Sequence, residues 1–198
     1  MTWTDDATFE ELVAPGVALW DVSDRMPQGS HSRATKRPKG QVIDRVFVHH
    51  SGALGKPGVA GARNSAAYVT QKRDFPGPGY HYWVPFEELR DDDGRLCILR
   101  LVPDVTRAWH SGSVANHRGV GVALQGNTTA RPLSYSHEEC LEALIPWLVT
   151  RFALPMPEGL SWHSDAARSG GRSKAACPGV NAEAWLKGYL RGYRTEAA

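Results

Sequence analysis

The sequence is poor in cysteine, with only Cys97, Cys140 and Cys177 among 198 residues. A low, odd count argues against a framework of disulfide bonds, the usual device of small secreted domains. Cys97 lies in a strand-like apolar run and Cys140 on an amphipathic stretch, so we expect both to be small buried apolar residues. Cys177 differs because it stands in a loop before Pro178 and Gly179, the context expected of a metal ligand.

Long hydrophobic runs are also absent. No apolar stretch approaches the roughly 20 residues that a membrane-spanning helix needs. The first residues, MTWTDD, contain neither the basic start nor the apolar segment of a secretory signal. These absences predict a protein that stays in the cytoplasm, or leaves it by a route that this chain does not encode.

Neither sign of charge is in excess, since 23 basic and 21 acidic residues give a formal net charge of +2. Nucleic-acid-binding proteins usually carry a strong basic excess, so we expect no nucleic-acid partner. The length suits one domain with a real core. Basic residues do gather among Gly, Ser and Pro in residues 25–41. This segment is either a solvated loop leading into the core or a surface for an anionic polymer such as teichoic acid or DNA.

The pattern of apolar residues predicts alternating strands and helices. Strands are expected at 42–49, 80–85, 96–102 and 119–125, and helices at 6–14, 64–73, 136–152 and 181–193. Ser136 can cap the longest helix, with Glu139 in the capping-box position, and Asn64 or Ser65 can cap the helix at 64–73. The interleaving predicts an α/β fold: a single domain with a central mixed β-sheet flanked by helices.

Three positions far apart in the chain have the character of one zinc site. His49 ends an apolar run, where its side chain can point from the sheet edge into a cleft. His163 and Cys177 lie on either side of the Gly/Ser-rich loop 168–173, which can fold back and bring both side chains to one point. Two imidazoles and a thiolate suit Zn²⁺, and three protein ligands leave the fourth tetrahedral position open for water. Although any one histidine is more often a structural residue, the trio predicts a hydrolase with one Zn²⁺ per chain.

Five short motifs occur in an order that is familiar from one family. They are VHHS at 48–51, GYHY at 79–82, WHSG at 109–112, GVGV at 119–122, and His163 followed by CPG at 177–179. Each motif alone is weak, but the five in this order resemble the type-2 N-acetylmuramoyl-L-alanine amidases, which are related to the peptidoglycan recognition proteins and the phage lysozyme-amidases. The resemblance covers about residues 42–190. It implies that 42–198 form a zinc amidase catalytic domain and that 1–41 are an N-terminal extension, partly irregular and basic.

The resemblance implies cleavage of one bond in peptidoglycan, the amide between the lactyl group of N-acetylmuramic acid and L-alanine of the stem peptide. His49, His163 and Cys177 match the zinc ligands of the family. His49 is the match rather than His50, because the ligand of the family directly follows the apolar strand. His50 is then expected at the rim of the substrate cleft, with the ligand role as its alternative.

Two further positions bear on the chemistry that the resemblance implies. Tyr80 matches the catalytic tyrosine, whose phenol can orient water and hydrogen-bond the oxyanion as it forms; otherwise it is an aromatic residue packed in the core. The family often carries Lys or Thr two residues before the third ligand, where this chain has Ala175. Lys174, or Arg172, is therefore the candidate helper, and the alternative for both is a solvated loop cation.

The remaining histidines and polar residues receive supporting roles. His110 and Asn116 match positions that line the substrate groove, and His110 could instead be a partner of the zinc site or a surface residue. Asp165 is expected to orient the His163 imidazole, or else to cap a turn. His81 alternates with Tyr80 along its strand, so we expect it to face the other way and to be structural. We expect His31, His117 and His137 to be exposed.

The setting that fits these expectations is a phage or prophage endolysin that is monomeric and acts on the cell wall after release from the cytoplasm. A wall-recycling bacterial amidase also fits. Two alternatives of other kinds remain open: a non-catalytic peptidoglycan-binding protein on the same fold, and a zinc amidohydrolase of another substrate.

Overall fold

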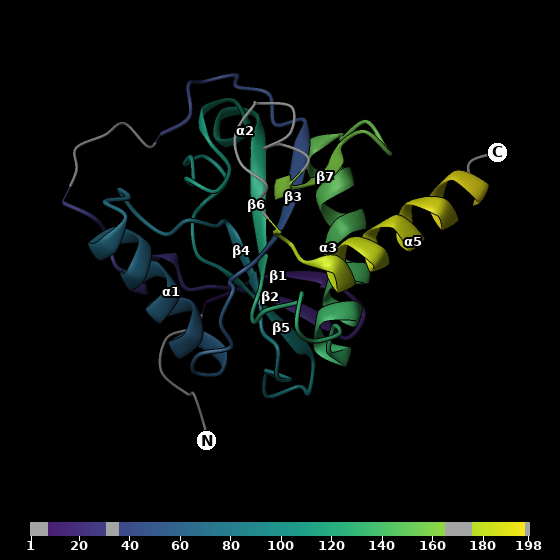
Figure 1. Ribbon diagram of the computed structural model, residues 1–198, viewed down its shortest axis with the longest axis horizontal. Coiled ribbons are helices and arrows are strands. Elements are labelled where there is room, and N and C mark those ends of the chain that lie inside the picture. The colour runs from purple at the N-terminus through teal and green to yellow at the C-terminus, as the bar shows by residue number, and fades with distance from the viewer. Residues whose placement is uncertain (1–7, 31–35, 165–175, 197–198) are drawn as a thin grey trace.

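A seven-stranded mixed β-sheet in the order β1-β2-β5-β4-β6-β3-β7 runs through the molecule (Figure 1). The computed structural model describes residues 8–30, 36–164 and 176–196. The strands are β1 (Thr8–Ala14), β2 (Val17–Asp21), β3 (Arg45–His50), β4 (Tyr82–Val84), β5 (Leu96–Arg100), β6 (Gly119–Leu124) and β7 (Leu160–Trp162). The helices are α1 (Gly58–Lys72), α2 (Ser113–Arg118), α3 (Tyr135–Phe152) and α5 (Val180–Glu196), with a short 3-10 turn, η1 (Ser23–Arg25).

The strands that carry the sequence motifs lie side by side and run in the same direction. β4 pairs with β6, β6 with β3, and β3 with β7, all in parallel. The antiparallel pairs are β1 with β2 and β4 with β5. β3 is therefore an interior strand, and its residues Val46, Phe47 and Val48 are buried, as a continuous apolar run predicts. The α/β fold with a central mixed sheet is confirmed.

Helices cover both faces of this sheet. In Figure 1, α1 lies on one side, and α3 with α5 on the other. Leu141, Leu144 and Leu148 of α3 pack with the apolar side chains of the central strands in one core. On the opposite face, Ala62 and Ala66 of α1 belong to a second core cluster. This second face is the one that carries the candidate site.

The N-terminal residues form a strand where a helix was expected. Thr8–Ala14 is β1, which pairs antiparallel with β2 after a tight turn at Gly16. The spacing of apolar residues in FEELV suits either a helix or an irregular strand, and the decisive partner is β2. That strand was not predicted, and neither was β7. β2 in turn pairs in parallel with β5, so this hairpin extends the same sheet.

The helix caps also differ from those expected. Ser134, not Ser136, caps α3: its hydroxyl accepts a bond from the His137 amide, and the His137 side chain accepts from the Ser134 amide. Ser136 instead donates to the carbonyl of Pro85 at 3.1 Å. The expectation that His137 is exposed is therefore wrong, because His137 is buried beneath the start of the helix. Helix α1 begins at Gly58, well before Asn64 and Ser65.

Burial can be compared with the expectations for three further residues, whereas His31 lies outside the described residues. Cys97 and Cys140 are free and buried, and His117 is exposed, as predicted. Within the described ranges, no helix combines the length and the apolar character needed to cross a bilayer. By contrast, Arg37 of the basic segment 25–41 is buried rather than solvated and donates to the carbonyls of Asp104 and Gly119 at 3.0 and 2.7 Å. Arg37 thus fastens an irregular segment to the sheet.

Candidate functional site

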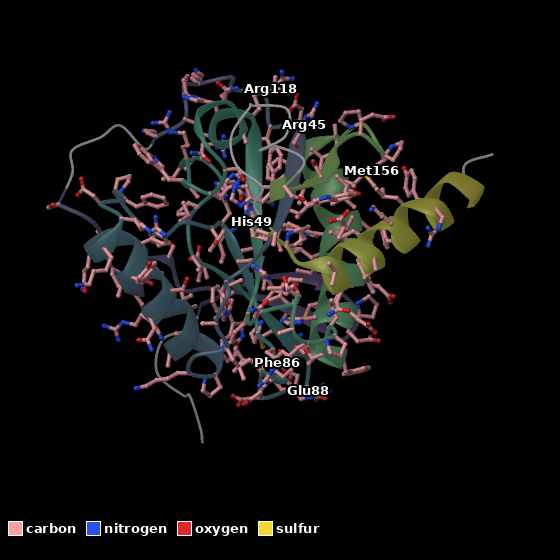
Figure 2. The ribbon with its side chains drawn as sticks, in the orientation of Figure 1. Arg45, His49, Phe86, Glu88, Arg118 and Met156 are labelled. Carbon is pink, nitrogen blue, oxygen red and sulfur yellow. The ribbon has the colours of Figure 1, made fainter. Side chains whose placement is uncertain are left out.

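Three donor atoms from distant parts of the chain converge near the carboxyl ends of strands β3 and β7. His49 lies near the carboxyl end of β3, and His163 directly follows β7, the parallel neighbour of β3. Their rings lie 4.9 Å apart, and Figure 2 places His49 near the middle of the molecule. Cys177 comes from the loop before α5. One ligand atom from each of the three residues lies within 4.8 Å of the others.

The donor set and its spacing suit zinc. Cys177 Sγ lies 3.6 Å from His49 Nδ1. Bond lengths of about 2.3 Å to sulfur and 2.0–2.1 Å to nitrogen, at a tetrahedral angle, give a separation of about 3.6 Å. His49 is buried, while His163 and Cys177 are half-buried. A metal held here would have protein on one side and an approach from solvent on the other.

The loop that carries Cys177 is fastened at several points. The amide of Ser164 donates to the Cys177 carbonyl at 2.9 Å, and Thr128 Oγ1 donates to the carbonyl of Pro178. Gly179 adopts a φ of +93°, and a Cβ there would lie 2.5 Å from the amide nitrogen of Thr129. Only glycine fits this position. The CPG motif therefore fixes the path of the loop, and it also supplies the thiol of Cys177.

Burial raises the pKa of the Cys177 thiol to about 11, although a hydrogen bond from the His50 amide, 3.4 Å from Sγ, acts in the opposite direction. A cation beside the sulfur would favour the thiolate. The pKa of His49 lies well below its ordinary value because of burial first, then because of the neighbouring His110 and His163. Burial also lowers the pKa of His163. Neutral imidazoles are the form that binds metals.

The side chain of His50 is not one of the three converging donors. Its Nδ1 lies 3.2 Å from Thr128 Oγ1, the hydroxyl that donates to Pro178. Because that hydroxyl has given its proton to the carbonyl, His50 Nδ1 is the donor in the contact. His50 thus supports the loop after β6, and its place at the rim of a substrate cleft stays a prediction.

The second ring nitrogen of His49 has partners of its own. His49 Nε2 lies 3.2 Å from His110 Nδ1 and 3.1 Å from Ser111 Oγ. Asn116 Oδ1 accepts from the amides of His110 and Ser111 at 2.9 and 2.8 Å. His110 and Asn116 are both buried. In the structure, His110 contacts His49, and Asn116 binds the backbone of residues 110 and 111. The contact with substrate that was expected of both residues stays a prediction.

The ring of His110 lies directly on the backbone of β6. A Cβ at Gly121 would be 2.7 Å from His110 Cγ, so the GVGV motif leaves room for an imidazole. Behind it, His81 accepts from the Gly121 amide through Nδ1 at 3.0 Å and lies 3.2 Å from Arg37 through Nε2. His81 is fully buried, which agrees with the structural role expected for it. Its ring lies 5.9 Å from that of His110, behind the site.

Tyr80 flanks the cluster from the segment before β4. Its ring lies 5.1 Å from that of His49. Burial raises the pKa of the phenol, and the nearby Cys177 adds to the effect. The hydroxyl is therefore a proton-bearing group beside the donor cluster. Asp165, Arg172 and Lys174 lie outside the described residues.

The profile of the N-acetylmuramoyl-L-alanine amidases (Amidase_2) matches residues 39–180, which is well over half of the chain. The chain belongs to this family. Among curated proteins, no relative matches the sequence significantly.

Solved structures of amidases and of peptidoglycan recognition proteins share the fold of this family member. The amidase LysC from Clostridium intestinale has a TM-score of 0.60 at 20% identity, and the match covers 87% of this chain and 97% of that one. The Ph2119 endolysin from a Thermus scotoductus bacteriophage has a TM-score of 0.62 at 17% identity, covering 85% and 96%. Peptidoglycan recognition protein LE, in complex with tracheal cytotoxin, has a TM-score of 0.60 at 15% identity, covering 80% and 86%. At these identities the likeness shows the fold alone.

Sequence reasoning missed three residues that shape the site of this amidase-family chain: Ser111, Gly121 and Thr128. Ser111 and Gly121 belong to the motifs WHSG and GVGV, which carry the resemblance. The motifs were recognised, but no function was predicted for these two residues. Thr128 stands in no motif. Its contacts to His50 and to the residue after Cys177 depend on two loops meeting in space, which no local pattern encodes.

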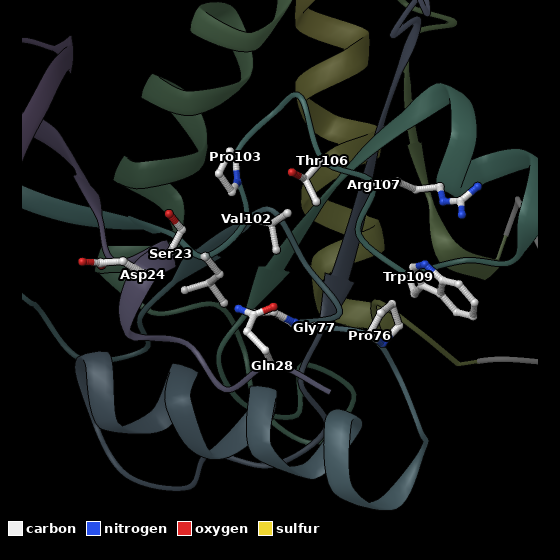
Figure 3. Close-up of a pocket in the computed structure, with 12 residues that line it drawn as sticks. Ser23, Asp24, Gln28, Pro76, Gly77, Val102, Pro103, Thr106, Arg107 and Trp109 are labelled. Carbon is white, nitrogen blue, oxygen red and sulfur yellow. The ribbon is translucent and has the colours of Figure 1, made fainter. Parts of the chain in front are cut away.

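A separate hollow lies beside the segments that lead into the site. It has a volume of about 320 Å³ and is bordered by the loop at 23–28, the turn at 76–78 and the segment 101–109. Figure 3 shows Trp109 and Pro76 at one end, and Ser23 and Asp24 at the other. Trp109 also packs against Phe75, with ring centroids 5.9 Å apart. None of the three converging donor residues borders this hollow.

Proposed function

We propose that the protein is a zinc-dependent peptidoglycan hydrolase that cleaves the amide between N-acetylmuramic acid and L-alanine. The observation that carries the proposal is the convergence of His49, His163 and Cys177 in a chain of the amidase family. Two nitrogens and one sulfur form the donor set of an open zinc site. When bound, zinc supplies a Lewis acid that polarises the carbonyl and makes water a better nucleophile near neutral pH.

Residues around the donor cluster would stabilise the charge that develops during hydrolysis. In the reaction, water adds to the lactyl carbonyl carbon, the C–N bond breaks, and L-alanine leaves with a free amino group. The ring of Tyr80 lies 5.1 Å from that of His49 between centroids, and its phenol can donate a hydrogen bond to the oxyanion that forms on the carbonyl oxygen. A helper role for Lys174 or Arg172 remains a prediction that rests on the resemblance.

The biological setting we propose is lysis by a phage or prophage endolysin. The support is that one similar structure is a bacteriophage endolysin and another is an endolysin amidase from Clostridium intestinale. The substrate is then the peptidoglycan of a bacterial wall. Two structures on the same fold are complexes with tracheal cytotoxin, a monomeric diaminopimelic acid-type peptidoglycan, which supports the same class of substrate.

A non-catalytic peptidoglycan receptor is the second candidate, because recognition proteins share this fold. The complete donor set favours the enzyme, since a receptor has no need of two histidines that converge on a cysteine. A zinc amidohydrolase of another substrate is the third candidate, and only the products distinguish it from the amidase.

The test is to measure zinc by elemental analysis and then to follow purified sacculi with and without a chelator. We expect one zinc per chain, loss of turbidity that the chelator stops and added zinc restores, and new L-alanine amino termini. Zinc without new amino termini would favour another amide substrate. Binding to sacculi without zinc and without cleavage would favour the receptor.

A further inference from the structure

Ser111 lies where its hydroxyl can serve two imidazoles at once. Ser111 Oγ is 3.1 Å from His49 Nε2 and 3.0 Å from His110 Nδ1, and these two nitrogens are 3.2 Å apart. An unprotonated imidazole nitrogen has one lone pair to offer, whereas a hydroxyl both donates and accepts. Two arrangements satisfy all three atoms, and they run in opposite directions. In the one that leaves His49 Nδ1 without a proton, His49 Nε2–H donates to Ser111 Oγ and the Ser111 hydroxyl donates to His110 Nδ1.

This arrangement fixes which nitrogen of His49 carries the proton. With the proton on Nε2, the free lone pair is on Nδ1, the atom that faces Cys177 Sγ at 3.6 Å. A direct bond from His49 to His110 would occupy the single lone pair that the Ser111 hydroxyl also reaches. The relay through Ser111 avoids this competition and leaves the metal-binding nitrogen free.

Asn116 fixes the place of Ser111. Asn116 Oδ1 accepts from two consecutive amides, those of His110 and Ser111, at 2.9 and 2.8 Å. The backbone amide of Asn116 donates to the carbonyl of Gly112 at 2.9 Å, which closes the turn at the start of α2. The Asn116 side chain is buried, so water does not compete for these bonds. The hydroxyl of Ser111 is thereby held next to His49 by the backbone.

We propose that Ser111 is a positioning residue, which selects the Nε2–H tautomer of His49 and so presents Nδ1 to a metal ion. The inference rests on the proposed zinc site and assigns Ser111 no contact with substrate. It explains why a serine follows His110 at a point where the side chain meets a buried ligand.

The first experiment uses the unaltered protein. Nitrogen-15 NMR of the histidine side chains distinguishes a protonated from an unprotonated ring nitrogen, before and after addition of Zn²⁺. We expect His49 to carry its proton on Nε2 in both states, and the Nδ1 signal to move when zinc is added. A proton on Nδ1, or a zinc-dependent change at Nε2 alone, would overturn the proposal.

The second experiment measures zinc affinity by competition with a coloured chelator. We expect Ser111→Ala to bind zinc about tenfold more weakly, the lower end of the loss typical of partners behind a ligand. Ser136→Ala is the matched control, because it removes a buried hydroxyl on α3 that donates to the Pro85 carbonyl. Ser111→Thr keeps the hydroxyl and is expected to retain affinity.

Thermal unfolding of the metal-free variants shows that they are folded. If Ser111→Ala binds zinc as tightly as Ser136→Ala does, Ser111 has no positioning role. Neither experiment uses cell walls, so the two proposals fail separately. A protein that binds zinc as described but leaves sacculi intact would contradict the proposed function and not the role of Ser111.

Discussion

Cys177 Sγ lies 3.6 Å from His49 Nδ1, although 128 positions in the sequence separate the two residues. Their meeting depends on β3 and on the fastened loop before α5, and it creates the donor pair on which the proposed chemistry rests. His163 completes the set from the end of β7.

Replacing this sulfur should remove the metal. We expect Cys177→Ala to lose stoichiometric zinc and wall hydrolysis together, because two imidazoles alone hold zinc weakly. Elemental analysis of the purified variant measures this directly. His50→Ala is the control, since His50 turns toward Thr128, and it should retain one zinc per chain. Loss of zinc from His50→Ala, with retention in His49→Ala, would show that the ligand was assigned to the wrong histidine.

Removing the phenol of Tyr80 should separate binding from catalysis. Tyr80→Phe keeps the ring that packs beside His49 but cannot donate to the oxyanion. We expect full zinc content and a turnover lower by about 10²–10³-fold, the usual effect of deleting one such donor. Turnover is measured as the release of L-alanine amino termini from sacculi, and zinc content by elemental analysis of the same sample. Undiminished turnover would mean that Tyr80 is only a packing residue.

A methyl group at Gly121 of β6 should displace the ring of His110, which lies against this position. The added Cβ would lie 2.7 Å from His110 Cγ, so the imidazole that contacts His49 must shift. We expect Gly121→Ala to lower the free energy of unfolding by about 1–3 kcal/mol, as overpacking does, and also to weaken zinc binding.

The matched control for this change is Gly188→Ala in α5, where the nearest contact of an added Cβ is an arginine side chain at 3.9 Å. This variant should be more stable by about 0.5–1 kcal/mol, because alanine favours the helix. Urea unfolding measures both variants. Equal stabilities would show that β6 tolerates the methyl group.

The protein should lose stability in mild acid through His137. Burial lowers the pKa of His137 to about 4 in the folded state, and the nearby backbone of Val84 and Gln125 opposes this shift only in part. The unfolded chain takes up this proton near pH 6.5, whereas the folded chain takes it up only near pH 4. Stability therefore falls as the pH drops from about 6.5 to about 4, by about 3 kcal/mol in total.

His137→Gln tests this dependence without losing the helix cap, because glutamine also suits the third position of a capping box. The free energy of unfolding of the variant should change less between pH 7 and pH 5 than that of the unaltered protein. Parallel curves for the two proteins would place the acid sensitivity elsewhere.

The features that could be predicted are those that a local pattern encodes. The apolar run before His49 indicated a buried strand with a polar side chain at its end, and the stripe along α3 indicated a helix. β1 was missed because its conformation is decided by pairing with β2, and the cap of α3 because His137 was not recognised as a partner of Ser134.

The candidate site shows the same division. Histidine and cysteine types, with the motif order, were enough to name the donor residues that the fold brings together. The hydroxyl of Ser111 and that of Thr128 could not be assigned, because each bridges segments more than 45 residues apart in the sequence. Such contacts become visible only once strands β3 and β6 lie side by side.

The wide separation of the donor residues has a practical consequence for anyone preparing the protein. A chain that has folded only in part cannot bring all three donors to one point with native geometry. Tightly held zinc per chain would then report the fraction of correctly assembled molecules in a sample. The metal would serve as an internal gauge of quality before any cell wall is added.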